Sequence, residues 1–178
     1  MKKTNLIIML SLMIMLAFQS IAYAGTGWEC DAKEIENVQN FSDGNTVRVV
    51  GTPRGALLSS FEVALSDKGS GRVGIFGAVL CHESMKEIRM NLYLDVWNTS
   101  TSDWEQIKSY KFSWNETNTS LSDRNAGVVD FDVTGLQRGR DYRVRGYAGA
   151  YDYNGNHETW NADSQSIQVQ SLDNLVTE

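Results

Sequence analysis

Apolar and polar residues alternate along most of the chain, and this two-residue period is the feature that most constrains the fold. Ile88, Met90, Leu92, Leu94 and Val96, for example, occupy every second position of one run. Successive side chains of a β-strand point to opposite faces of its sheet, so such a run has one buried and one outward face. After the first two dozen residues no stretch keeps a helical period. The sequence therefore predicts an all-β protein.

Similar alternating runs recur along the chain, separated by turn residues such as Lys68-Gly69-Ser70-Gly71 and Asn154-Gly155. Seven short antiparallel strands in about 115 residues are typical of a sandwich of two sheets. A closed barrel with a similar number of strands is the alternative. The predicted strands lie near residues 57–66, 71–81, 87–97, 103–113, 127–134, 141–151 and 159–169.

The first 24 residues have the three parts of a secretory signal peptide. Lys2 and Lys3 precede an apolar run, and a polar break is followed by Ala22-Tyr23-Ala24, a small-x-small cleavage site. The alternative is an uncleaved membrane anchor, but the uninterrupted run is shorter than the ~20 residues that span a bilayer. We therefore expect a secreted, extracellular protein.

The mature chain divides into three segments. Residues 25–54 are polar and weakly periodic, which predicts an N-terminal arm with one β-like run from Val47 to Val50. We expect residues 55–170 to form the β-sandwich domain and residues 171–178 to form a flexible tail. Loss of the two signal-peptide lysines leaves 14 basic and 22 acidic residues, a net charge of −8. An acidic surface disfavours nucleic acid and anionic membranes as partners.

Cys30 and Cys81 are the only two cysteines. In an exported chain an even number of cysteines favours a disulfide. A bridge between them would close about 51 residues and stabilise the fold by roughly 4 kcal/mol. The alternatives are a buried thiol at Cys81 and a free thiol at Cys30. Two cysteines and two histidines do not supply a spaced zinc-ligand cluster, so we expect no metal or other cofactor.

One ten-residue segment resembles the sixth strand of fibronectin type III and related immunoglobulin-like domains. Leu136, Gly139, Tyr142 and Val144 match the tyrosine-corner motif, and Arg138 replaces its usual proline. The resemblance implies that the Tyr142 hydroxyl bonds back to the preceding loop. It also implies that the predicted fold is a seven-stranded antiparallel immunoglobulin/fibronectin-III-like sandwich.

A longer resemblance covers residues 54–169. The matching segments are residues 54–60, 69–73, 88–94, 142–146 and 154–158, with Trp104. They resemble an uncharacterised family of small secreted β-domains of Gram-positive bacteria, a domain of unknown function. This resemblance implies a fold and a compartment but no activity.

Outward aromatic residues are the main functional lead. If the apolar residues of the predicted strand 87–97 face inward, Tyr93 and Trp97 point outward. Tyr147 and Tyr151 point outward from the predicted strand 141–151 in the same way. Trp160 lies on the predicted strand that flanks them. Such a face can bind sugar rings or apolar groups. The alternative is that Trp104 and three arginines cover these rings and stabilise the sheet. Those arginines are Arg89, Arg143 and Arg145.

The 152–158 loop carries oxygen-bearing side chains at alternate positions: Asp152, Asn154, Asn156 and Glu158. This order is a weak calcium-site signal. Asn-Gly between strands is also the strongest ordinary hairpin signal, and we favour the hairpin.

No catalytic constellation stands out. Asp130 and Asp132 share one strand face, as solvated acidic residues commonly do, and neither histidine has a neighbouring nucleophile. We therefore expect a secreted, non-catalytic binding or surface-interaction module whose partner is a glycan or a cell-surface protein. A structural, self-assembling protein of the cell exterior is the alternative, and a carbohydrate-active hydrolase is a less favoured one.

Overall fold

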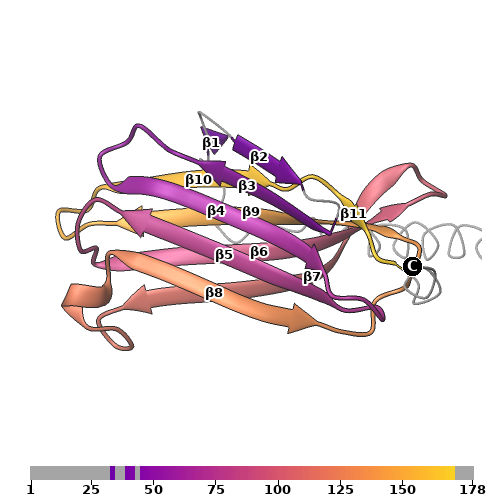
Figure 1. Ribbon diagram of the computed structural model, residues 1–178. Coiled ribbons are helices and arrows are strands. Elements are labelled where there is room, and N and C mark those ends of the chain that lie inside the picture. The colour runs from indigo at the N-terminus through magenta and orange to yellow at the C-terminus, as the bar shows by residue number, and fades with distance from the viewer. Residues whose placement is uncertain (1–32, 35–38, 43–44, 171–178) are drawn as a thin grey trace, which may run out of the picture. The chain divides into compact units, whose positions relative to one another are not determined.

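The computed structural model describes residues 33–34, 39–42 and 45–170 (Figure 1). The described residues belong to one compact unit, Asp31–Glu178. The predicted signal peptide, most of the predicted arm, Cys30 and the predicted tail lie outside the described residues. What is described is all-β, apart from one short 3-10 helix, η1 (Leu121–Asp123).

Two antiparallel sheets pack against each other, rather than one sheet closing into a barrel. One sheet has the order β1-β10-β9-β6-β7, with β11 also pairing with β9, and the other has the order β2-β3-β4-β5-β8. The pairing of β1 with β10 is parallel. The strands are β1 (Lys33–Glu34), β2 (Gln39–Ser42), β3 (Thr46–Gly51), β4 (Leu58–Asp67), β5 (Val73–Cys81), β6 (Glu87–Asn98), β7 (Asp103–Asn115), β8 (Ala126–Val133), β9 (Asp141–Tyr151), β10 (His157–Asp163) and β11 (Ile167–Gln168).

The first six predicted strands correspond to β4 through β9. The seventh is divided into β10 and β11, because the chain leaves the ladder at Ser164. The hydroxyl of Ser164 donates a hydrogen bond to the Gln165 carbonyl and accepts one from the Val144 N–H. The part of the chain that the structure describes thus holds eleven strands, where the alternation predicted seven.

The predicted arm differs from the structure in its second half. Residues 46–51 are β3, which pairs with β4 from Thr46 to Gly51. Val47 and Val49 point into the core, so this strand is anchored by apolar burial as well as by its hydrogen bonds. The boundary of the packed fold therefore lies before residue 46 and not at residue 55.

The core consists of the inward residues of the two sheets. Ile88, Met90, Leu92 and Leu94 of β6 are fully buried, as the alternation predicts. They belong to one hydrophobic cluster with residues of the opposite sheet such as Phe61. Gly146 permits this close packing, because a Cβ there would overlap the side chains of Val63 and Phe61.

The tyrosine-corner segment has the hydrogen bonds that the motif implies. The Tyr142 hydroxyl donates to the carbonyl of Gln137 and accepts from its N–H, each at 3.0 Å. Gly139 adopts a φ of 74°, a left-handed conformation that glycine tolerates without strain. This corner fixes the connection from β8 to the start of β9.

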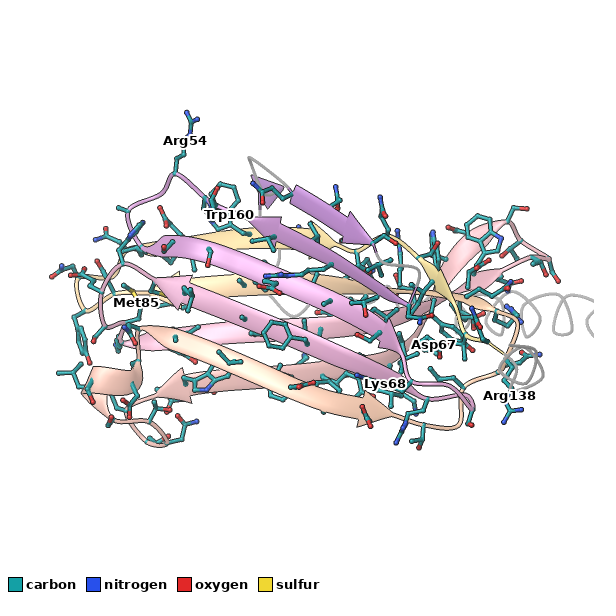
Figure 2. All side chains as sticks on the ribbon, in the orientation of Figure 1. Arg54, Asp67, Lys68, Met85, Arg138 and Trp160 are labelled. Atoms are coloured by element: carbon teal, nitrogen blue, oxygen red, sulfur yellow. The ribbon has the colours of Figure 1, made fainter. Side chains whose placement is uncertain are left out.

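The loops gather at the two ends of the packed sheets. Figure 2 labels Met85 at one end, and Lys68 and Arg138 at the other. The β6–β7 turn lies with Lys68 and Arg138, whereas the β5–β6, β7–β8 and β9–β10 connections lie with Met85.

Candidate ligand-binding face

The predicted aromatic face is the outer surface of the sheet that contains β6, β7 and β9. In the register of β6 and β9, Tyr93 lies opposite Arg145 and Glu87 lies opposite Tyr151. These positions alternate with the core residues of the same strands, so their side chains lie on the outward face. Four of the five predicted aromatic residues share this face: Tyr93, Trp97, Tyr147 and Tyr151.

Trp160 is not on this face. Its strand, β10, does flank β9, but the prediction that Trp160 joins the outward aromatic residues is wrong. The β9–β10 register places Trp160 opposite Ala148, which is fully buried in the core. Trp160 therefore points inward, where it is part of the hydrophobic cluster.

A buried carboxylate organises the centre of the outer face. Asp95 is 1% exposed and accepts hydrogen bonds from Nε of Arg143 at 3.0 Å and Nε of Arg145 at 2.7 Å. The Arg143 guanidinium lies 4.6 Å from the centre of the Trp104 ring, and that of Arg145 lies 5.1 Å from the centre of Tyr93. Each arginine is thus held between a carboxylate and an aromatic face.

Trp97 and Trp104 form a cross-strand pair next to this centre. They lie directly opposite each other on β6 and β7, with ring centres 5.3 Å apart at an angle of 68°. Both are half-buried. Arg140 donates a hydrogen bond to the carbonyl of Trp97 and so holds the strand end in place. We call Trp97, Trp104 and Arg143 the tryptophan surface.

A second aromatic group lies on the same face at the opposite end of the strands. The Arg89 guanidinium lies 4.5 Å from the centre of the Tyr151 ring, and the His157 ring stacks on Tyr151 at 5.8 Å. Glu87 forms an ion pair with Arg89 at 2.7 Å. Tyr151 is half-buried, with a cation and an imidazole ring in contact with it.

The outer face is therefore less open than a bare aromatic platform. Tyr93 is 7% exposed and Tyr147 is 1% exposed. Of the two alternatives that the sequence left, cover by arginines and Trp104 describes three of the predicted rings: Arg145 lies on Tyr93, Arg89 lies on Tyr151 and Trp104 packs on Trp97. The aromatic rings that stay partly accessible are Trp97, Trp104 and Tyr151.

Asp95 is the residue of this face that the sequence reasoning missed. It is the only acidic residue at an outward position in the middle of β6, and β9 carries arginines at two successive outward positions, Arg143 and Arg145. This pattern could have identified Asp95, because an acid on one strand can pair with arginines on the neighbouring strand, which lies about 4.8 Å away.

The four oxygen-bearing side chains of the 152–158 loop do not converge on one point. The Asp152 carboxylate accepts hydrogen bonds from the backbone N–H of Asn154 and Asn156 and from the Asn156 side chain. These bonds, the one from the Asn156 side chain foremost, lower the pKa of Asp152 from its ordinary value. They close the tight hairpin that Asn154-Gly155 predicts, and φ is 88° at Gly155.

Glu158 instead crosses to the other sheet. Its carboxylate accepts hydrogen bonds from three consecutive backbone N–H groups, those of Ala56, Leu57 and Leu58, at 2.7–2.9 Å. Because Glu158 is committed to this segment, it is not available to share a cation with Asp152. In the described residues no group of three or more His, Cys, Asp or Glu side chains could hold a metal ion.

The two candidate catalytic carboxylates lie on the outer face of the other sheet. Asp130 and Asp132 of β8 are exposed and lie opposite Phe76 and Gly74 of β5. Asp132 is 3.6 Å from Arg72, in an exposed ion pair. This is the solvated acidic strand face that the alternation indicates.

Cys81 is buried at the end of β5 and has no disulfide partner among the described residues. Burial, with a smaller contribution from the charge of Glu158, raises the pKa of this thiol from 9.0 to about 12. Its predicted disulfide partner, Cys30, lies outside the described residues. The bridge therefore stays a prediction.

No protein-family model matches the chain, and no curated protein is significantly similar to it. Its resemblance to small secreted β-domains of Gram-positive bacteria therefore stays a hypothesis. Within the residues that the structure covers, no helix is long and apolar enough to cross a membrane.

Proposed function

We propose that this protein is a secreted, non-catalytic binding module with a fibronectin-III-like sandwich fold, and that the tryptophan surface contacts its ligand. The observation that carries the proposal is the arrangement of Trp97, Trp104 and Arg143: two half-buried indole rings beside a guanidinium that Asp95 holds in place.

The strand order supports the fold assignment. Counted from β4 to β10, the first, second and fifth strands (β4, β5, β8) share one sheet, and the third, sixth and seventh (β6, β9, β10) share the other. Strands A, B and E of an immunoglobulin domain share one sheet in the same way, and C, F and G share the other. Here the fourth strand, β7, extends the second group, and β1, β2 and β3 are additions at the sheet edges.

The tyrosine corner supports the same assignment. In this family of folds a tyrosine near the start of strand F bonds back to the backbone a few residues upstream. Tyr142 is the second residue of β9, the sixth strand in this count, and it bonds to Gln137 in both directions.

The chemistry of the tryptophan surface favours a ligand that has both a flat apolar face and oxygen acceptors, such as a sugar ring. Indole rings supply apolar contact area at a low cost in side-chain entropy, and guanidinium groups donate in a fixed plane. Arg143 and Arg145 already share the carboxylate of Asp95, so their positions are fixed before a ligand arrives. Such preorganisation reduces the entropy that binding costs.

The experiment is a binding screen of mature residues 25–178 against a glycan array and purified bacterial cell wall. We expect Trp97→Ala and Trp104→Ala each to weaken binding at least tenfold, because aromatic anchors at interfaces commonly contribute ~2 kcal/mol or more. Leu121→Ser is the matched control, since Leu121 is an exposed apolar residue at the opposite end of the strands. Folding of each variant is checked by circular dichroism. Unchanged binding by both folded tryptophan variants would refute the proposal.

A further inference from the structure

Arg124 is a buried cation at the end of the sheets away from the tryptophan surface. It follows η1 in the β7–β8 connection and is 5% exposed. Its carbonyl accepts a hydrogen bond from the N–H of Met85, which Figure 2 labels at that end. The neighbouring Asn125 carbonyl accepts one from Cys81. The backbone around Arg124 is therefore held by the β5–β6 connection.

Among the described residues the guanidinium of Arg124 has one hydrogen-bond partner, the Tyr153 hydroxyl, which lies 2.7 Å from Nη2. The guanidinium carbon lies 5.9 Å from the centre of the same ring. The two other nitrogens, Nε and Nη1, are buried and have no hydrogen-bond partner in the residues that the structure describes. In the described part of the chain Arg124 takes part in no ion pair, whereas Arg143 and Arg145 both pair with Asp95.

Within the described residues, Arg124 is therefore a buried positive charge without an ion-pair partner. A guanidinium has five N–H donors in one plane, and burying such donors without a partner costs free energy because they lose their hydrogen bonds to water. Oxyanions match this fork geometry with two parallel hydrogen bonds. The guanidinium has two edges that can each donate two parallel hydrogen bonds, Nε with Nη2 and Nη1 with Nη2. The Tyr153 hydroxyl accepts from Nη2, which both edges share, so it lies where an oxygen of a bound anion would lie.

The Tyr153 side chain can move away from Nη2 of Arg124. It belongs to the β9–β10 hairpin loop and is 53% exposed, so its ring can turn toward solvent without opening the core. The carboxylate of the preceding residue, Asp152, does not compete for Arg124. It accepts three hydrogen bonds from donors of its own loop.

We propose that Arg124 anchors a binding site for an oxyanion group, a carboxylate, sulfate or phosphate, and that Tyr153 covers this site until the anion displaces its hydroxyl. The site is separate from the tryptophan surface and does not depend on the function proposed for that surface. Its ligand would be an acidic small molecule or an acidic substituent of a larger one.

The test is calorimetric titration of mature residues 25–178 with sodium sulfate, sodium phosphate or sodium acetate, against sodium chloride at matched ionic strength. We expect saturable binding of at least one of these anions. Tyr153→Phe frees Nη2 by removing one hydrogen bond, and should tighten that binding about fivefold. Arg124→Gln and Arg124→Lys should abolish it, because neither keeps the fork of donors. The three anions distinguish a planar carboxylate from a tetrahedral oxyanion.

Arg138→Gln is the matched control, since Arg138 is an exposed arginine at the other end of the sheets. It should bind the anion as the wild type does. If the Arg124 variants do not fold, the tighter anion binding expected of Tyr153→Phe tests the proposal by itself. The proposal is overturned if neither the wild type nor Tyr153→Phe binds any of the three anions. It is also overturned if a folded Arg124 variant binds like the wild type, or if Arg138→Gln loses binding to the same extent.

Discussion

The two carboxylate oxygens of Asp95 each accept a hydrogen bond from the guanidinium of Arg145, at 2.7 and 3.2 Å. Asp95 is on β6 and Arg145 is on the neighbouring strand β9, on the outward face of their sheet. A second arginine, Arg143, bonds to the same carboxylate at 3.0 Å. One buried acid thus holds two cations, and each cation in turn packs on an aromatic ring.

Asp95→Asn should destabilise the fold by about 2–3 kcal/mol. The variant keeps the size of the side chain but removes the charge that two partly buried arginines share. The free energy of unfolding from urea titrations measures the effect. Asp130→Asn, an exposed change on the other sheet, is the control and should stay within about 0.5 kcal/mol of the wild type. Equal effects of the two changes would mean that the Asp95 ion pairs do not stabilise the fold.

Tyr142→Phe should cost about 1–2 kcal/mol, because it removes both hydrogen bonds between the hydroxyl and the Gln137 backbone. Tyr110→Phe is the matched control. Its ring packs on Phe131 at 4.7 Å and keeps that contact after the hydroxyl is removed. The urea concentrations at the unfolding midpoints of the two variants are compared, with the same dependence of the unfolding free energy on urea for both. A Tyr142 variant as stable as the Tyr110 variant would argue against a stabilising corner.

How much of this fold is predictable from sequence depends on the range of the interaction concerned. The alternation of β6 identifies every second residue from Ile88 to Val96 as inward, because a strand's two faces are fixed locally. The inward position of Trp160 is also readable locally, because Trp160 and Ala162 are buried at alternate positions of β10 and Asn161 and Asp163 are less buried. The partners of Asp95, by contrast, lie about 50 residues away, and the sequence does not specify the register that brings them together.

Glu158→Gln should destabilise the fold by about 2–3 kcal/mol. The carboxylate accepts from the N–H groups of Ala56, Leu57 and Leu58 through both of its oxygens. An amide would turn its own N–H₂ toward one or two of these donors and leave them unsatisfied. Glu83→Gln, at an exposed loop position, is the control. Urea unfolding of both variants measures the difference.

Gly55→Ala tests the same contact from the other side. A Cβ at Gly55 would overlap the carboxylate of Glu158, so the acid must move from its three donors. We expect a loss comparable to that of Glu158→Gln. Because the two changes disrupt one contact, the double variant should be little less stable than either single variant. Fully additive losses would show that the two residues act independently.

The Cys81 thiol should make the reduced protein less stable in alkali. Its pKa is raised to about 12 in the folded state, mainly by burial, against 9.0 ordinarily, so the unfolded state loses its proton first. The stabilisation is therefore complete below pH 9 and declines as the pH rises from 9 toward 12. The stability difference between wild type and Cys81→Val, measured with reductant present, should shift in favour of the valine variant over this range. A difference that is independent of pH would contradict the raised pKa.

The same cysteine allows a test of the predicted bridge to Cys30. Mature protein purified without reductant and then denatured in guanidinium should show no titratable thiol if the bridge forms, and two if it does not. In the second case native protein should still react slowly at Cys81, because only the thiolate is nucleophilic and burial suppresses it. Cys30→Ser isolates that rate. Rapid alkylation of Cys81 in folded Cys30→Ser protein at pH 8 would show that the thiol is not buried.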